Sequence, residues 1–211
     1  PGSGGSLLGG LGEEGLFEVD PVAAVARRVG TDEAPGRNVS DVRREAEGGG
    51  VWIATSDLGA FRWDGGSTFE RHGPLQGLPD ARVWAVLEDR EGIVWLGTDS
   101  GLAKLGPSAF RTYSPEDGLP PASPLYGMAE TPDGVLWFGG HDRGLLCRAE
   151  DGAFRLYTSG DGLPHTEVRS FCVSPEGDVI VTTSRGAVRI SKGRVSPFPL
   201  PDGAPRTIDK I

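Results

Sequence analysis

Long hydrophobic runs are absent from this sequence of 211 residues, and no apolar stretch approaches the about 20 residues that a membrane-spanning helix needs. The first ten residues, PGSGGSLLGG, have neither a basic region nor an apolar stretch long enough for an intact signal peptide. We therefore expect a chain without membrane insertion, in which residues 1–6 form a flexible segment and residues 7–211 form one domain.

Cysteine is scarce as well. Cys147 and Cys172 are the only two cysteines, too few for a disulfide framework. Cys147 is predicted to lie on an outer strand of one repeat and Cys172 on the inner strand of the next, two strand positions apart at about 4.8 Å each, which exceeds the reach of a disulfide. Both are predicted to be free, buried thiols.

Positive charge is outnumbered, with 21 Lys and Arg against 30 Asp and Glu and a net charge of -9. This balance disfavours a nucleic-acid partner, because binding to phosphates relies on clustered Lys and Arg. The three histidines, His72, His141 and His165, have no metal-site spacing, and the Asp-Gly pairs lack the alternating oxygen ligands of a calcium loop. No metal and no cofactor are expected.

Glycine-rich turns at a fixed interval are what the sequence does contain. Trp52, Trp95 and Trp137 recur 43 and 42 residues apart, and two series of turn glycines keep the same period. A weaker first repeat begins near Leu7. About five repeats of about 43 residues, rich in turn residues and poor in helical periodicity, predict an all-β fold, a β-propeller of about five four-stranded blades.

Each repeat is predicted to contain four short strands, A to D from the axis outwards. In the third repeat they cover about 82–88, 94–98, 102–105 and 110–113. Residues 21–37 are interpreted as a D strand with a variant loop, and the alternative is an inserted helix. The tail 204–211 is predicted to supply the A strand that the first repeat lacks, which would close a five-blade ring. The alternative is a larger, seven-blade propeller completed by further blades or by a second copy.

The recurring aromatic residues are predicted to pack between blades, because each lies mid-strand among apolar neighbours. Trp84 and Tyr126, on the inner strands, are also assigned to the core. One aligned inner-strand position carries small residues, which fits crowding near the axis. It is occupied by Ala85, Gly127 and Ser170, with Asp41 as the exception. The Asp-Gly-Leu-Pro loops and the Asp-Gly turns are interpreted as structural.

These motifs resemble those of the two-component-regulator propeller repeat, which occurs in the sensor regions of bacterial hybrid histidine kinases. The resemblance is carried by Phe110-x-x-Tyr113, by Asp117-Gly118-Leu119-Pro120, and by Glu88-Asp89-x-x-Gly92-x-Val94-Trp95-Leu96-Gly97-Thr98-x-x-Gly101-Leu102. It implies a bladed sensor or interaction domain, usually periplasmic and usually part of a longer chain with seven blades per propeller. A periplasmic or extracellular location is the corresponding expectation, with a cytoplasmic one as the alternative.

A ligand is expected where the B–C loops and the starts of the inner strands gather at the mouth of the propeller, although an ordinary solvated rim is the competing interpretation. The mixed charge there suits a polar partner, a glycan or a protein. The predicted ligand-binding residues are Asp57, Arg82, Asp99, His141, Asp142, Arg143, His165, Glu167 and Arg185.

Catalysis is the alternative function. His165 and Glu167 are conceivable as a general acid and base, and streptogramin lyases are propellers that use His and Glu. No nucleophile, metal cluster or triad accompanies the pair in the sequence. The sequence therefore favours a non-catalytic binding or sensing module.

Overall fold

A computed structural model describes residues 7–10, 14–30, 35, 38–106, 110–120, 124–140 and 142–199. The described residues form β-strands and three short 3-10 helices. The chain divides into two compact units, residues 1–112 and 113–211. Within the described ranges, no helix has the length and apolar character needed to cross a membrane.

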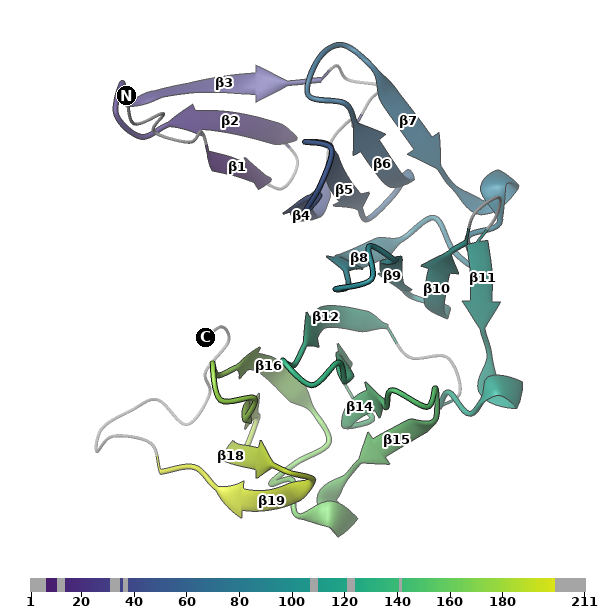
Figure 1. The fold of residues 1–211 in the computed structure, drawn as a ribbon, viewed down its shortest axis with the longest axis vertical. Helices are drawn as coiled ribbons and strands as arrows, with labels where there is room; N and C mark the ends of the chain where they lie inside the picture. The colour runs from purple at the N-terminus through teal and green to yellow at the C-terminus, as the bar shows by residue number, and fades with distance from the viewer. Residues whose placement is uncertain are drawn as a thin grey trace. The chain divides into compact units, whose positions relative to one another are not determined.

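The first unit contains three sheets whose strands follow one another in chain order (Figure 1). One sheet has three described strands, and each of the other two has four. The strands of the first sheet are β1 (Leu7–Gly10), β2 (Leu16–Asp20) and β3 (Val25–Val29). Those of the second are β4 (Val39–Arg44), β5 (Val51–Thr55), β6 (Gly59–Trp63) and β7 (Phe69–His72). Those of the third are β8 (Val83–Glu88), β9 (Val94–Thr98), β10 (Gly101–Leu105) and β11 (Phe110–Tyr113).

The second unit contains two four-stranded sheets of the same order. The first consists of β12 (Leu125–Glu130), β13 (Leu136–Gly140), β14 (Leu145–Arg148) and β15 (Phe154–Tyr157). The second consists of β16 (Val168–Val173), β17 (Val179–Thr183), β18 (Gly186–Ser191) and β19 (Arg194–Pro197). The prediction of about five repeated sheets is confirmed.

The predicted strands of the third repeat agree closely with β8 to β11, and β9 and β11 match residue for residue. In the first repeat, β3 confirms a D strand in place of the alternative helix. The proposed closing strand, 204–211, lies outside the described residues, so closure stays a prediction.

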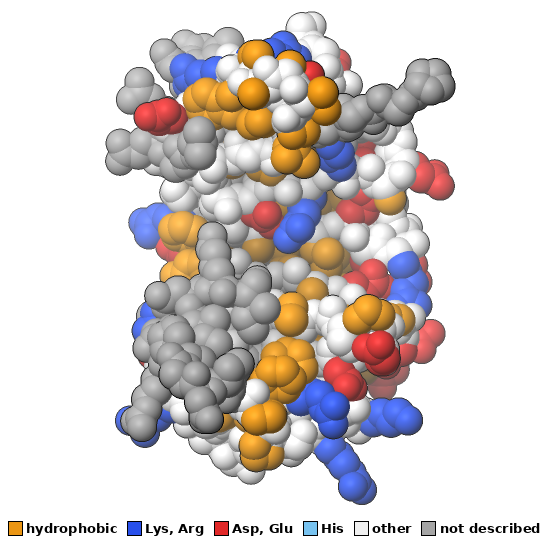
Figure 2. Space-filling view, turned by 90° about the vertical axis from the view of Figure 1, so that its left-hand side faces the viewer, with side chains coloured by type: hydrophobic (Ala, Val, Ile, Leu, Met, Phe, Trp, Pro, Cys, Tyr) orange, Lys and Arg blue, Asp and Glu red, His pale blue; other side chains and the backbone are white. Residues whose placement is uncertain are grey.

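Figure 2 shows hydrophobic side chains on the surface over the first sheet, where Leu7, Val22 and Val25 are exposed.

Apolar side chains pack between neighbouring sheets within each unit. In the first unit, Trp52 belongs to a buried cluster with Val83, Val86 and Leu96 of the next sheet. In the second unit, Trp137 packs with Val179 and other residues of β16–β19. Trp95 is buried as well. The prediction that these three tryptophans are core residues is confirmed.

The turns have the structures that their sequences predict. Short 3-10 helices η1 (Pro74–Gln76), η2 (Pro115–Asp117) and η3 (Ser159–Asp161) precede the inner strands. In η2, Asp117 accepts a hydrogen bond from the backbone N–H of Ser114, while Gly118 takes a positive φ of 91° that suits glycine. The following leucine, Leu119, is buried. The Asp-Gly-Leu-Pro motif is therefore a structural turn.

The inner strands β4, β8, β12 and β16 each have an irregular register near their start. The shifts lie between Val39 and Asp41, Val83 and Ala85, Leu125 and Gly127, and Val168 and Ser170. Each skips one residue, as a β-bulge does. These residues are Ser40, Trp84, Tyr126 and Arg169.

The bulges account for two wrong core predictions. The side chain of Tyr126 is 45% exposed, and Trp84 is only partly buried. Simple alternation along the strand would place both inside, but a bulge re-aims the residue at which it occurs. A smaller correction concerns Cys172, which is partly buried, although both cysteines are free as predicted.

Candidate functional site

The predicted ligand-binding residues of the first unit lie at the ends of its sheets, in the β5–β6 and β9–β10 turns and before β8. Asp99 accepts hydrogen bonds from the guanidinium of Arg82, at 2.8 Å, and from the indole Nε1 of Trp84. Asp57 is exposed and accepts a hydrogen bond from the Asn38 side chain at 3.1 Å. Arg82 and Asp99 are thus brought together as the sequence predicts.

A buried threonine gives these turns their shape. The Thr98 hydroxyl donates to the carbonyl of Gly101 at 2.9 Å and accepts from the Ser100 N–H at 3.2 Å. Thr55 and Thr183 make the corresponding bonds in their own turns. The threonine that ends the B strand therefore holds the neighbouring polar residues, Asp99 among them, in a fixed turn.

The second unit carries the other predicted residues. His165 Nδ1 lies 3.0 Å from the Ser184 hydroxyl and accepts the Glu167 N–H at 3.1 Å. The Glu167 carboxylate forms an ion pair with Arg169 at 2.7 Å. Asp142, Arg143 and Arg185 are exposed, and His141 lies outside the described residues. His165 and Glu167 are therefore neighbours, but the carboxylate is paired with Arg169.

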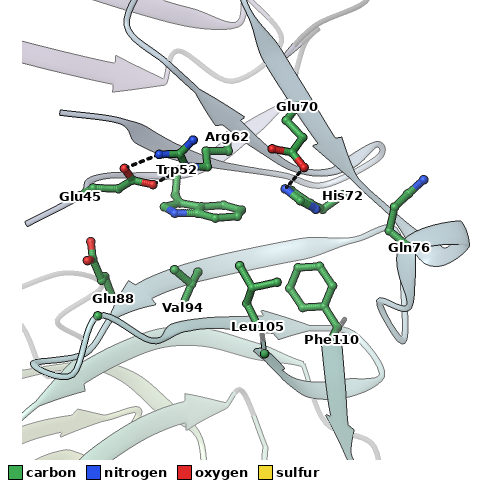
Figure 3. Close-up of a pocket in the computed structure, with 12 residues that line it drawn as sticks. Glu45, Trp52, Arg62, Glu70, His72, Gln76, Glu88, Val94, Leu105 and Phe110 are labelled. Carbon is green, nitrogen blue, oxygen red and sulfur yellow. Dashed lines mark hydrogen bonds and ion pairs between the residues drawn. The ribbon is translucent and has the colours of Figure 1, made fainter. Parts of the chain in front are cut away.

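A second candidate site, which the sequence did not predict, is a cavity of about 470 Å³ between the β4–β7 and β8–β11 sheets. Figure 3 shows charged side chains from the first of these sheets above Val94, Leu105 and Phe110 of the second. The volume lies in the range of small-molecule sites. The residues that line the cavity are Glu45, Trp52, Arg62, Glu70, His72, Gln76, Glu88, Gly92, Val94, Leu105, Gly106 and Phe110.

Glu45 and Arg62 form the strongest polar contact in this cavity. Two hydrogen bonds, at 2.5 and 2.8 Å, join the guanidinium to both carboxylate oxygens. Such bidentate pairs fix the orientation of both groups. The hydrogen bonds from Arg62 hold the pKa of Glu45 below its usual value, although burial opposes the shift. Both side chains are therefore charged at neutral pH and neutralise each other.

Three aromatic rings, two from the first of these sheets and one from the second, line the cavity. The His72 ring lies 5.2 Å from the Trp52 ring and 5.5 Å from the Phe110 ring, centroid to centroid. His72 is 9% exposed, and within the described part of the chain its Nε2 has no hydrogen-bond partner. The nearest carboxylate oxygen, Oε1 of Glu70, is 3.8 Å away (Figure 3). That gap is too long for a hydrogen bond.

The signal for this cavity in the sequence is a departure from the repeat. His72 stands where the later Phe-x-x-Tyr strands have Tyr113 and Tyr157. Arg62 pairs with Trp52 across β5 and β6, whereas Cys147 pairs with Trp137 across β13 and β14. The repeat predicts the positions that recur, so the positions that differ from it, such as Arg62 and His72, were not predicted as a site.

His72 gives stability a pH dependence. Burial lowers the pKa of His72, while the carboxylate of Glu70 opposes this effect and Arg62 reinforces it. Because the native pKa lies below the unfolded value of about 6.5, the unfolded chain binds the proton first as the pH falls. The contribution of neutral His72 to stability is therefore complete above about pH 6.5 and is lost as the pH falls through the native pKa.

We expect His72→Tyr, which restores the residue of the later repeats, to reduce this loss. The melting temperatures of both proteins are compared at pH 7.5 and pH 5. The decrease in melting temperature from pH 7.5 to pH 5 should be smaller in the variant, because it lacks His72 and shares every other titrating group. An equal decrease in the two proteins would contradict burial of neutral His72.

Comparison with known proteins supports the repeat seen in the sequence. Residues 77–100 match the family described as two component regulator propeller. No curated protein sequence matches the chain. The resemblance inferred from the motifs is thus confirmed for a segment that runs from η1 to the β9–β10 turn.

Solved structures extend the likeness to most of the chain. One is the extracellular domain of BT3049 from B. thetaiotaomicron, described as a hybrid two component system, with a TM-score of 0.79 and 19% identity over 93% of this chain. Another is the extracellular domain of BT4673 from the same organism, with a TM-score of 0.76 and 14% identity over 97%. This chain spans 28% of the length of each.

A propeller enzyme is also similar. Virginiamycin B lyase from Staphylococcus aureus has a TM-score of 0.63 and 20% identity, with 79% of this chain and 57% of the lyase covered. At these identities the comparisons show the fold. They confirm a β-propeller, whose blades are the sheets described above.

Proposed function

We propose that this chain is a non-catalytic binding module of a sensing protein, and that it recognises a polar ligand, a glycan or a protein partner, at the ends of its blades. The observation that carries the proposal is the cluster around Asp99. There a carboxylate, the Arg82 guanidinium and the Trp84 indole are already held together by hydrogen bonds. A preorganised polar cluster beside an aromatic ring suits a ligand rich in hydroxyl or charged groups, because little ordering is needed on binding.

The similar structures support a sensing role outside the cytoplasm. Two of them are extracellular domains. One is described as part of a hybrid two component system and the other as part of a one component system. We infer a periplasmic or extracellular location for this chain by analogy. The same analogy suggests that further propeller blades, from the same protein or from a second copy, accompany it.

A lyase activity receives less support from the geometry. The similarity to virginiamycin B lyase draws attention to His165 and Glu167. The Nδ1 of His165 is engaged by Ser184 and by the Glu167 N–H, and the Glu167 carboxylate is held by Arg169. A general base needs its acceptor atom within reach of the proton that it removes. A carboxylate already paired with arginine is less available for this role.

The test is a thermal-shift screen against neutral and sulfated oligosaccharides and against Lys-rich and Asp-rich peptides. A compound that binds only the folded protein raises its melting temperature, by an amount that grows with concentration. We expect a hit whose affinity falls about tenfold in Asp99→Asn, as loss of a charge-assisted hydrogen bond implies.

Arg111→Gln is the matched control, because Arg111 is an exposed residue of β11 outside this cluster. Its affinity for the same compound should equal that of the unaltered protein. If Asp99→Asn binds the compound with unchanged affinity, the cluster around Asp99 is not the binding site. Turnover of quinupristin by the purified chain would overturn the non-catalytic assignment.

A further inference from the structure

The cavity between the second and third sheets differs from the corresponding space in the other unit. There, between β12–β15 and β16–β19, the equivalent positions carry Cys147 and Tyr157, which belong to a buried cluster with Val179 and Ile190. In the cavity these positions carry Arg62 and His72. The same backbone frame thus supports an apolar core in one place and a cavity lined by charged and polar groups in the other.

The charge of the lining is unbalanced. Glu45 and Arg62 neutralise each other through their bidentate pair. Glu70 and Glu88 also line the cavity, and Arg62 is the only cationic side chain among the described residues that line it. The Glu70 side chain is 65% exposed. The cavity therefore has an excess of negative charge on the side where it meets solvent.

His72 supplies an independent indication of a ligand. Its side chain is 11% exposed, it lines the cavity, and its Nε2 has no hydrogen-bond partner among the residues that the structure describes. Neutral imidazole carries one donor nitrogen and one acceptor nitrogen. A ligand nitrogen that bears several N–H groups can donate to Nε2 and to the Glu70 carboxylate at once, bridging two atoms that are 3.8 Å apart.

The remaining walls specify what should be attached to that nitrogen. Phe110 lies 5.5 Å from the His72 ring, and Leu105 and Val94 line the same side of the cavity (Figure 3). Apolar walls favour a hydrocarbon stem, and aromatic faces attract a cation. An anionic ligand would instead meet the carboxylates of Glu70 and Glu88.

We propose that this cavity binds a small organic cation, an ammonium or guanidinium group on an apolar stem, with the cation between Glu70 and His72 and the stem along Phe110 and Leu105. The site is separate from the cluster around Asp99, and the proposal does not rest on ligand binding there. A lysine side chain of another protein carries the same chemistry, so the experiment separates the two sources.

The test is calorimetric titration of the full chain at pH 7.5 with n-hexylammonium, 1-hexanol and hexanoate, which share one stem and differ in charge. We expect binding of n-hexylammonium, at least tenfold weaker binding of 1-hexanol, and none of hexanoate. Equal affinity for the amine and the alcohol would overturn recognition of charge. Binding of Nα-acetyl-lysine methylamide without binding of n-hexylammonium would overturn the small-molecule assignment in favour of a protein side chain.

Two variants locate the site. Glu70→Gln removes the exposed carboxylate and should weaken n-hexylammonium about fivefold, the change that corresponds to an exposed ion pair of about 1 kcal/mol. Glu150→Gln, an equally conservative change at an exposed turn residue outside the cavity, should leave the affinity unchanged. Both variants should melt like the unaltered protein, since both side chains face solvent. Equal affinity in Glu70→Gln and Glu150→Gln would overturn the proposed site.

Discussion

Replacing Trp95 by alanine should destabilise the protein by about 3 to 5 kcal/mol, the usual cost of deleting a large buried aromatic side chain. Trp95 is 1% exposed, and its Nε1 donates a 2.7 Å hydrogen bond to the carboxylate of Asp89. Asp89 is itself buried and closes the β8–β9 turn by accepting the N–H groups of Glu91 and Ile93. The substitution therefore leaves a cavity and removes one partner of a buried carboxylate.

Urea unfolding at pH 7.5 measures this effect, and Trp95→Phe is the matched control. Phenylalanine keeps most of the packing but has no N–H, so the loss should be about 1 to 3 kcal/mol, as for an unsatisfied buried group. If the free energy of unfolding of Trp95→Ala is within about 1 kcal/mol of that of the unaltered protein, the assignment of Trp95 to the core is wrong.

Gly144→Ala should have a comparably large effect, for a steric reason. Gly144 is the last residue of the β13–β14 turn and has a φ of 104°. A Cβ built there would lie 2.0 Å from the carbonyl oxygen of Tyr157. Its N–H also donates to Thr166 on the segment that leads to β16. Alanine must both adopt a strained backbone and push β15 away, so we expect a loss of about 3 kcal/mol or more.

Gly186 offers a matched control in the next blade of the same unit. It also has a positive φ, 141°, but a Cβ there would meet only Pro164 at 3.8 Å, an ordinary contact. Gly186→Ala should therefore cost only the backbone strain, about 1 to 3 kcal/mol. Thermal or urea unfolding of the two variants separates the cost of backbone strain from the cost of crowding by Tyr157. Equal losses would show that crowding by Tyr157 does not matter.

The strands were predictable because two local signals coincide at each of them. The apolar run of β9 is bounded by a turn glycine at Gly92 and by Thr98, and the structure shows why each boundary falls there. Gly92 closes the preceding turn, and the Thr98 hydroxyl closes the next one. Such signals lie within a few residues of the strand, so a single sequence contains them.

The exposure of Trp84 and Tyr126 was not predictable in the same way. Apolar aromatic residues on an inner strand are ordinarily core residues, and the alternation of a regular strand agrees with that assignment. The register shift that re-aims them depends on the pairing with the next strand. The cavity beside His72 likewise depends on side chains from two sheets, which no single stretch of sequence brings together.

The β-bulge near the start of β4, β8, β12 and β16 gives two adjacent residues different roles, one in the core and one at the bulge. The residue before each bulge is a buried aliphatic, Val39, Val83, Leu125 or Val168. The bulged residues themselves provide a hydroxyl, an indole, a phenol and a guanidinium, in Ser40, Trp84, Tyr126 and Arg169. Four unrelated chemistries thus occupy one structural position without altering the buried frame beside it. The bulged position therefore tolerates different side chains, and substitutions confined to these four residues should preserve folding.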